Sequence, residues 1–334
     1  MINWKNLLAI ITITFLTSAC GSLSSNSKTS PSHNNRSSQT ADVAYAGSLE
    51  LLNHSTIGPN FRKTTGYSYL GRGGGSFGLA KEITSGSIHP NVFESIGSAP
   101  IKTLEPKWTN SYIQFASSPI VVAYNPSSPY ASELKSIAKG KTNLSKLFIL
   151  MSKPGFHLGR TNPNTDPQGQ AFYMMVQLAQ KNFNLPPYLS SKILGSVNNS
   201  SEIFSETALE SRLQAGQLDA ASAFESQAIQ LHLPYISLPS SINFGNIAYS
   251  SSYAKASMTL ANKKTIHGST LVLDATVIGK KDQAAARAFI DYLLSPQGRG
   301  SIKKAGYKLL KPQLFGPNPY FASYIKTHFG NTST

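Results

Sequence analysis

The stretch GRTNPNTDPQG, residues 159–169, leads directly into a segment with helical periodicity, residues 170–183. Pro163 and Pro167 lack amide donors and disfavour helix in the residues before them, so the stretch is predicted to be an irregular loop. Asp166 is suited to cap a helix that has Pro167 as its first residue. One helix face is apolar at i, i+3, i+4 and i+7, through Phe172, Met175, Val176 and Ala179. Such a helix start either binds an anion through its free amides or simply caps a surface helix.

The composition is that of a globular protein with about two domains. The chain has 334 residues, of which 40% are hydrophobic, and a formal net charge of +15. This excess of positive charge favours solubility and attraction to anionic lipid surfaces. Lysine and arginine form no compact block with interleaved aromatic residues, so nucleic acid is not an expected partner.

The N-terminus reads as a secretory signal, because Lys5 precedes an apolar run and then small residues up to Cys20. This pattern predicts a signal peptide over residues 1–19. The only cysteine of the chain resembles the lipid-accepting cysteine of a bacterial lipobox, although Thr17 stands where that pattern usually has leucine. The resemblance implies lipidation at Cys20 and an extracytoplasmic protein anchored to the cell membrane. An ordinary signal peptide with an incidental cysteine is the alternative.

The polar segment after the signal is predicted to be a flexible tether, residues 20–41, because it is rich in Ser, Asn and Thr. Two similar units follow, residues 43–53 and 67–84, and each reads as a strand, a turn and a helix. Their turns carry Gly47-Ser48 and, at the end of residues 72–76, Gly75-Ser76. Open α/β sheets bind ligands where strands end and helices begin, so both Gly-Ser pairs are candidate binding elements.

The glycines around Ser76 also match two functional motifs, G-x-G-x-x-G at residues 73–78 and G-x-S-x-G at residues 74–78. A dinucleotide-binding fold would open on this unit, whereas a complete strand–turn–helix precedes it. A hydrolase nucleophile elbow needs a later acid and histidine, and no histidine of the chain has a recognisable setting. Three consecutive glycines make both matches weak. A secreted serine hydrolase using Ser76 is retained as an alternative from another functional class.

The remaining chain alternates strands and helices, which predicts an α/β fold with two lobes. Residues 113–124 are rich in strand formers, and Asn125-Pro126 is a predicted crossing between lobes. Ser205 is predicted to cap a helix that starts at Glu206. The expected lobe boundaries are 42–124 with 250–334 for lobe I, and 125–249 for lobe II.

Several stretches together resemble the solute-binding proteins of molybdate/tungstate ABC transporters. They are residues 46–49, 75–76, 115–124, 159–179, 205–228 and 288–298. The resemblance implies a type II periplasmic-binding-protein fold with two hinge crossings, closing on its ligand like a clamp. It further implies a monomeric, non-enzymatic receptor without a cofactor. Its expected partners are molybdate or tungstate and an ABC permease with its ATPase.

The resemblance also implies a binding site. Ser48 and Ser76 match donors to the oxyanion, and Asp166 and Glu206 match two carboxylates that approach the metal centre. On physical grounds alone, a carboxylate beside a dianion is repelled, by several kcal/mol on an order-of-magnitude estimate. The pair therefore fits a site in which hard oxygens coordinate molybdenum or tungsten itself.

Phe224 departs from the resemblance, because the family has a tyrosine there whose hydroxyl bonds the ligand. Ser226 and Tyr249 are the candidate replacements for that hydroxyl. The departure leaves open a receptor of the same fold for another anion, such as sulfate, phosphate or a small organic anion.

Overall fold

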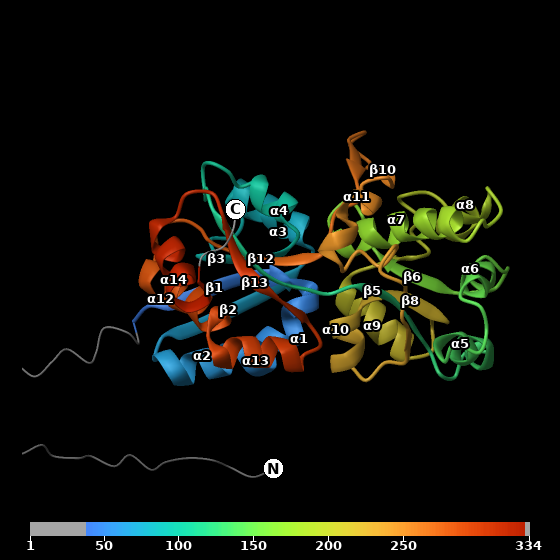
Figure 1. The fold of residues 1–334 in the computed structure, drawn as a ribbon, viewed down its shortest axis with the longest axis horizontal. Coiled ribbons are helices and arrows are strands. Elements are labelled where there is room, and N and C mark those ends of the chain that lie inside the picture. The colour runs from blue at the N-terminus through green and yellow to red at the C-terminus, as the bar shows by residue number, and fades with distance from the viewer. Residues whose placement is uncertain (1–37, 331–334) are drawn as a thin grey trace, which may run out of the picture. The chain divides into compact units, whose positions relative to one another are not determined.

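The computed structural model describes residues 38–330, which contain two main β-sheets. Within that range the first lobe is built on a six-stranded sheet in the order β13-β4-β12-β3-β1-β2. The strands are β1 Thr40–Ala46, β2 Ser68–Gly74, β3 Val92–Ile96, β4 Tyr112–Ser117, β12 Val272–Val277 and β13 Lys308–Phe315. β1 pairs in parallel with β2 and β3, whereas β12 runs antiparallel to β3 and β4. The strand order therefore mixes the beginning of the chain with its last third (Figure 1).

Helices cover both faces of this sheet (Figure 1). They are α1 Glu50–Leu52, α2 Gly58–Thr65, α3 Ser76–Ser85, α4 Ser98–Lys102, α12 Gln283–Leu294, α13 Pro296–Lys304 and α14 Pro319–Phe329. A 3-10 turn, η1 Gly47–Leu49, joins β1 to α1, and a π-helical turn, η2 Asn53–Ile57, joins α1 to α2. The core contains aromatic residues that are distant in sequence, since the Phe61 and Phe289 rings meet edge to face at 5.3 Å.

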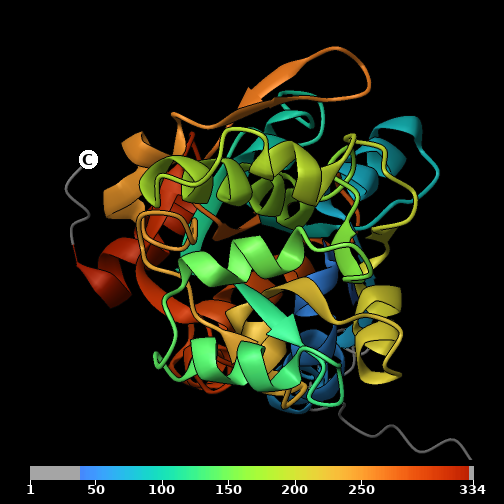
Figure 2. The same ribbon diagram turned by 90° about the vertical axis from the view of Figure 1, so that its right-hand side faces the viewer.

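The second lobe has a five-stranded sheet in the order β7-β6-β8-β5-β9 within the described range. Its strands are β5 Ile120–Tyr124, β6 Leu158–Thr161, β7 Ile203–Phe204, β8 Ala220–Phe224 and β9 Tyr235–Ile236. Its helices are α5 Ala131–Ala138, α6 Ser145–Met151, α7 Pro167–Asn182, α8 Leu189–Leu194, α9 Glu206–Gln214, α10 Glu225–Gln230 and α11 Ser250–Tyr253, with the turn η3 Ile247–Tyr249. A hairpin of β10 Ser257–Thr259 and β11 Thr265–His267 lies above α7 (Figure 2).

The chain crosses between the sheets twice, as expected, but at other residues. The first crossing is Ser118-Pro119, because β5 belongs to the second sheet and pairs with β8 and β9. The expected boundary after Tyr124, at Asn125-Pro126, is therefore too late. Pro119 interrupts the apolar run and lacks an amide donor, which is why the strand stops there.

The return crossing also lies later than residue 250. α11 and the β10–β11 hairpin pack with the second lobe, where the Ala261 amide donates to Asn164 Oδ1 at 2.8 Å. The chain rejoins the first sheet only at β12. The two crossings lie side by side, since the Ser118 amide donates to the Leu271 carbonyl at 3.3 Å.

The start of the chain needs one correction. β1 begins at Thr40, so the regular structure reaches two residues into the tether that was expected to end at residue 41. The predicted signal peptide, Cys20 and the tether up to residue 37 lie outside the described residues. Among residues 38–330, no helix combines the length and hydropathy needed to cross a membrane.

The glycine-rich part of β2 is explained by packing. The strand extends to Gly74, so residues 72–74 are not the turn that the sequence predicted. A Cβ on Gly71 would lie 2.5 Å from Tyr69 Oη, and a Cβ on Gly73 would lie 2.9 Å from Glu50 Oε2. These glycines make room for neighbouring side chains. Packing therefore explains the glycine run, and neither a nucleotide-binding loop nor a nucleophile elbow is needed to explain it.

Glu94 on β3 should make stability depend on pH. Burial raises the pKa of Glu94 to about 8, although the Asn53 amide that donates to its carboxyl at 2.9 Å lowers it. The folded protein therefore holds this proton more tightly than the unfolded chain. The resulting stability is present below the ordinary pKa of glutamate and is lost as the pH rises through about 8.

The Glu94→Gln variant tests this dependence by urea denaturation near pH 5 and near pH 8. From the lower to the higher pH, wild type should lose on the order of 3 kcal/mol more unfolding free energy than E94Q, because each pKa unit is worth about 1.4 kcal/mol. Equal losses in the two proteins would show that Glu94 does not titrate in this range.

Candidate functional site

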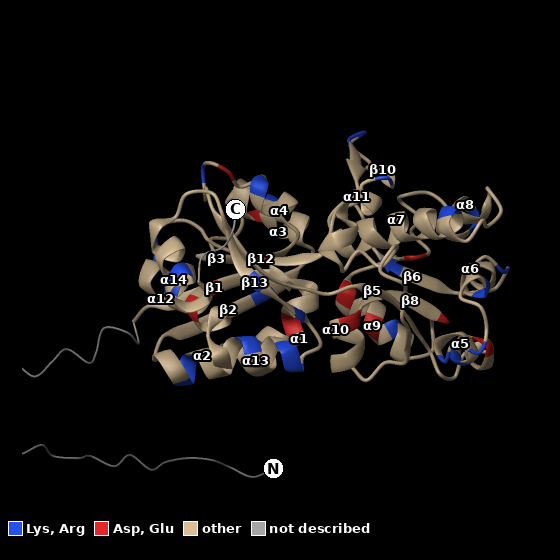
Figure 3. Cartoon of the chain, viewed as in Figure 1, with Lys and Arg blue, Asp and Glu red and all other residues tan. Residues whose placement is uncertain are grey.

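Two adjoining cavities form a cleft between the lobes, with volumes of about 280 and 380 Å³. Both are lined by Gly47, Glu50, Glu206 and Thr207. The larger one also reaches Asp166 and the glycines at the end of β2. Glu50 of α1 and Glu206 and Glu210 of α9 line these cavities, while lysine and arginine are spread over many helices of both lobes (Figure 3). The cleft therefore differs in charge from the basic chain as a whole.

Asp166 lies in the cleft and also caps α7, as the sequence predicted. Its Oδ1 accepts a hydrogen bond from the Gln168 amide at 2.8 Å. The preceding loop is closed on itself, because the Asn162 carbonyl accepts from the amides of Thr165 and Asp166 at 3.1 and 2.9 Å. Pro167 follows as the first helical residue. Local sequence thus directs the Asp166 carboxylate to the helix start.

Glu206 begins α9, and the Ser205 hydroxyl caps that helix by accepting from the Ala208 amide at 3.3 Å. The Glu206 side chain crosses the cleft to the first lobe, since a Cβ on Gly47 would lie 2.7 Å from Glu206 Oε2. The structure therefore brings the second lobe's carboxylate against the first Gly-Ser turn.

The carboxyls of Asp166 and Glu206 are buried and interact directly. Burial raises the pKa of both, and the charge of Asp166 raises the pKa of Glu206 further. A hydrogen bond with Glu206 acts the other way on Asp166 and lowers its pKa. Two carboxylates this close cannot both ionise cheaply, so a proton shared between them is favoured over two charges.

Ser48 lines the smaller cavity and carries a buried hydroxyl. Its side chain is 2% exposed, and its hydroxyl has no hydrogen-bond partner among the described residues. Its backbone carbonyl is held in place by the Tyr307 hydroxyl, which donates to it at 2.7 Å. A buried hydroxyl without a partner is costly, and a ligand that accepts its hydrogen bond would remove that cost.

Ser76 is placed differently from the sequence expectation. It is fully buried, and its hydroxyl accepts from the Ile96 amide at 3.2 Å instead of lining either cavity. The Phe77 and Gly78 amides at the start of α3 donate to the Thr165 carbonyl of the other lobe, at 3.1 and 3.3 Å. In this closed arrangement the α3 N-terminus binds the second lobe.

Phe224 ends β8 and is 1% exposed. It has no hydroxyl to make the ligand contact that the family's tyrosine makes at this position. Ser226 does not supply one, because its hydroxyl is fully buried and accepts from Ser118 at 3.0 Å. Tyr249 is 38% exposed and stacks on Tyr253. Neither residue lines the cavities.

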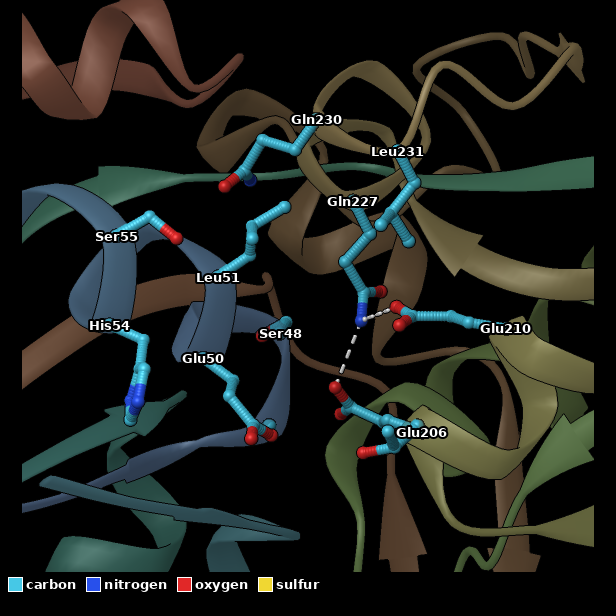
Figure 4. A pocket seen from close by; sticks show the side chains of 12 residues that line it. Ser48, Glu50, Leu51, His54, Ser55, Glu206, Glu210, Gln227, Gln230 and Leu231 are labelled. Carbon is cyan, nitrogen blue, oxygen red and sulfur yellow. Dashed lines mark hydrogen bonds between the residues drawn. The ribbon is translucent and has the colours of Figure 1, made fainter.

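Gln227, Glu50 and Glu210 were missed by reasoning from sequence. Gln227 donates from Nε2 to Glu206 Oε2 at 3.0 Å and to Glu210 Oε1 at 2.9 Å (Figure 4). The sequence does contain a signal for Gln227, which stands three residues after Phe224. A glutamine at the third position of a helix can accept a hydrogen bond from the backbone amide of the residue that precedes the helix. Within residues 38–330, no group of three His, Cys, Asp or Glu side chains could hold a metal ion.

A cleft between two α/β lobes joined by two adjacent crossings defines a solute-binding protein of the type II periplasmic-binding-protein fold, which confirms the predicted fold class. The sequence profile of the bacterial extracellular solute-binding protein family matches residues 41–308. The chain belongs to this family.

Relatives agree with this membership, and a solved structure agrees with the fold. The molybdate/tungstate-binding protein WtpA of Pyrococcus abyssi is 28% identical over 235 residues, covering 64% of this chain and 67% of that protein. A solute-binding protein of Saccharolobus solfataricus is 30% identical over 285 residues, covering 79% of this chain and 69% of that protein. The periplasmic molybdate-binding protein of Azotobacter vinelandii superposes with a TM-score of 0.57 at 18% identity, over 80% of this chain and 99% of that one. This last similarity supports the fold alone.

Proposed function

We propose that this protein captures molybdate or tungstate outside the cytoplasmic membrane and delivers it to an ABC importer. The observation that carries the proposal is the meeting of two buried carboxylates, Asp166 and Glu206, beside the Ser48 hydroxyl, which has no partner among the described residues. The names of relatives such as WtpA are consistent with this ligand class.

The carboxylate pair is the part of the site that selects the ligand. Carboxylates repel a dianion unless they coordinate its central atom, and molybdenum and tungsten accept hard oxygen ligands. In the proposed complex, Asp166 and Glu206 contact the metal centre as charged carboxylates, without a proton shared between them. The Ser48 hydroxyl donates to an oxygen of the anion.

Two other functions have less support. Phe224 favours an anion that needs no tyrosine hydroxyl, such as sulfate, phosphate or a small organic anion, but the central atom of sulfate or phosphate cannot use the carboxylates. A serine hydrolase would need Ser76 exposed beside a histidine, whereas its hydroxyl is buried against the Ile96 amide. We therefore propose a receptor without enzymatic activity.

The cellular setting is also part of the proposal. The sequence of residues 1–20 supports export and lipidation at Cys20, and residues 20–39 would then tether the receptor to the membrane. A monomer in this position can present its bound anion to a permease that an ATPase drives. The two cavities are lined by residues of one chain, so the proposed site needs no second subunit.

A thermal-shift panel tests the ligand. Tungstate and molybdate at about 100 times their dissociation constants should add about 2.7 kcal/mol of stability, because they bind only the folded state. The midpoint of unfolding should then rise by roughly 4 °C. Sulfate and phosphate at equal ionic strength serve as controls and should produce no comparable rise. A rise with sulfate or phosphate and none with tungstate or molybdate would refute the proposed ligand.

A further inference from the structure

Gln227 lies at the centre of a buried hydrogen-bond network behind the two carboxylates. Both of its amide hydrogens are used, one by Glu206 and one by Glu210. Its Oε1 accepts from the Phe224 amide at 3.0 Å and from Gln168 Nε2 at 2.9 Å. The side chain is 5% exposed, and every donor and acceptor of its amide has a partner. Such a side chain has one permitted orientation (Figure 4).

The network connects the two helices that carry the carboxylates. Gln168 belongs to α7, and its backbone amide donates to Asp166 while its side chain bonds Gln227. Gln168 Oε1 in turn accepts from the Ser222 hydroxyl of β8 at 2.8 Å. Asp166 and Glu206 are thus held relative to each other through two neutral amides and a strand.

We infer that Gln227, supported by Gln168, is a positioning residue that sets the selectivity of the cleft for oxyanions with a coordinating metal centre. This inference rests on the proposed function. Gln227 holds Glu206 Oε2 and thereby fixes the plane of the carboxylate beside Asp166. An amide suits this task because it donates to two acidic side chains without adding a charge to the cleft.

The consequence is a difference between anions. For tungstate, the orientation of Glu206 determines whether its oxygen reaches the metal, so loosening it should lower affinity. For sulfate, Glu206 contributes only repulsion, so loosening it should leave the weak binding unchanged or slightly improved. Gln227 therefore controls the ratio of the two affinities more than the stability of the fold.

The test is the Gln227→Met variant, which keeps the length of the side chain and removes all four hydrogen bonds. Tungstate and sulfate affinities are measured by calorimetry, and tungsten coordination in the bound state is measured by X-ray absorption. We expect tungstate affinity to fall at least tenfold, the tungstate-to-sulfate ratio to fall equally, and the shell of about six oxygens to lose a carboxylate oxygen. Gln168→Met should shift the ratio in the same direction but less, and it remains informative if Q227M does not fold.

Gln180→Met is the matched control, because Gln180 lies on α7 and accepts from the Ser190 amide at 2.8 Å, away from the cleft. It should leave both affinities unchanged. Wild-type protein that fails to bind tungstate would reject the proposed function itself. Wild type that binds it, together with Q227M and Q168M variants of unchanged selectivity and coordination, would reject only the positioning role. Equal losses for tungstate and sulfate would also reject it, since they would indicate a purely structural role.

Discussion

Replacing Asp166 with asparagine should weaken tungstate binding at least about a hundredfold, or roughly 2.7 kcal/mol, while changing the stability of the ligand-free protein little. The two roles of Asp166 separate in this variant. Asparagine caps helices as well as aspartate does, so the hydrogen bond from the Gln168 amide is retained. A neutral amide is a poor ligand for a hard, highly charged metal centre, so the coordination is lost. Calorimetry with tungstate and thermal unfolding without ligand measure the two effects.

Glu206→Gln should weaken tungstate binding by a similar factor, for the same reason. The helix itself should be unaffected, because Ser205 and not Glu206 caps α9. Glu133→Gln provides the control, since Glu133 forms an exposed ion pair with Lys153 at 3.8 Å. Exposed pairs of this kind contribute little, and the variant should bind tungstate normally. Wild-type affinity in D166N would reduce Asp166 to a helix cap, and wild-type affinity in E206Q would remove Glu206 from the ligand set.

Replacing Gly75 with alanine should lower tungstate affinity at least about thirtyfold by opposing closure of the lobes, since about 2 kcal/mol corresponds to that factor. A Cβ on Gly75 would lie 2.6 Å from the Thr165 carbonyl oxygen and 3.3 Å from Asp166 Cβ, both on the second lobe. The backbone of Gly75 has φ −60° and ψ 129°, which alanine adopts without strain. The clash therefore exists only while the lobes are closed.

Small-angle scattering with and without tungstate measures the closure directly. Wild type should contract on binding, and G75A should contract less at the same ligand concentration. The ligand-free G75A protein should unfold at the wild-type temperature. Gly300→Ala is the control, because Gly300 lies in α13 with no atom within 4 Å of an added Cβ. Normal affinity and full contraction in G75A would show that the lobes do not close through the α3 contact.

Local features of the site were predictable because their physics is local. The cap at Asp166, the proline after it and the cap at Ser205 depend on neighbours two or three residues away. The two Gly-Ser turns followed from the alternation of strands and helices, although β2 extends further than expected. The pairing of Asp166 with Glu206 came from the family resemblance, because nothing near either residue in sequence indicates the other.

The placement of the crossings required the sheets. Residues 113–124 read as one passage rich in strand formers, and only the pairing of β5 with β8 assigns its second half to the other lobe. Ser76 shows the same limit of prediction from sequence. Its place at a helix start was predictable, but not that the Thr165 carbonyl of the other lobe accepts hydrogen bonds from the amides next to it. Burial of a residue at a helix start depends on which distant segment covers it.

The sequence alone determined the class of fold and the helix start at Asp166, because periodicity, proline and capping act between close neighbours. Only the tertiary structure revealed how the two carboxylates are held. Gln227 bonds Glu206 across 21 positions of sequence and Gln168 across 59, and such partners become visible only once the chain has folded. The loop of residues 159–169 therefore presents one carboxylate by local rules, while its cooperation with Glu206 depends on a buried network assembled from separate parts of the second lobe.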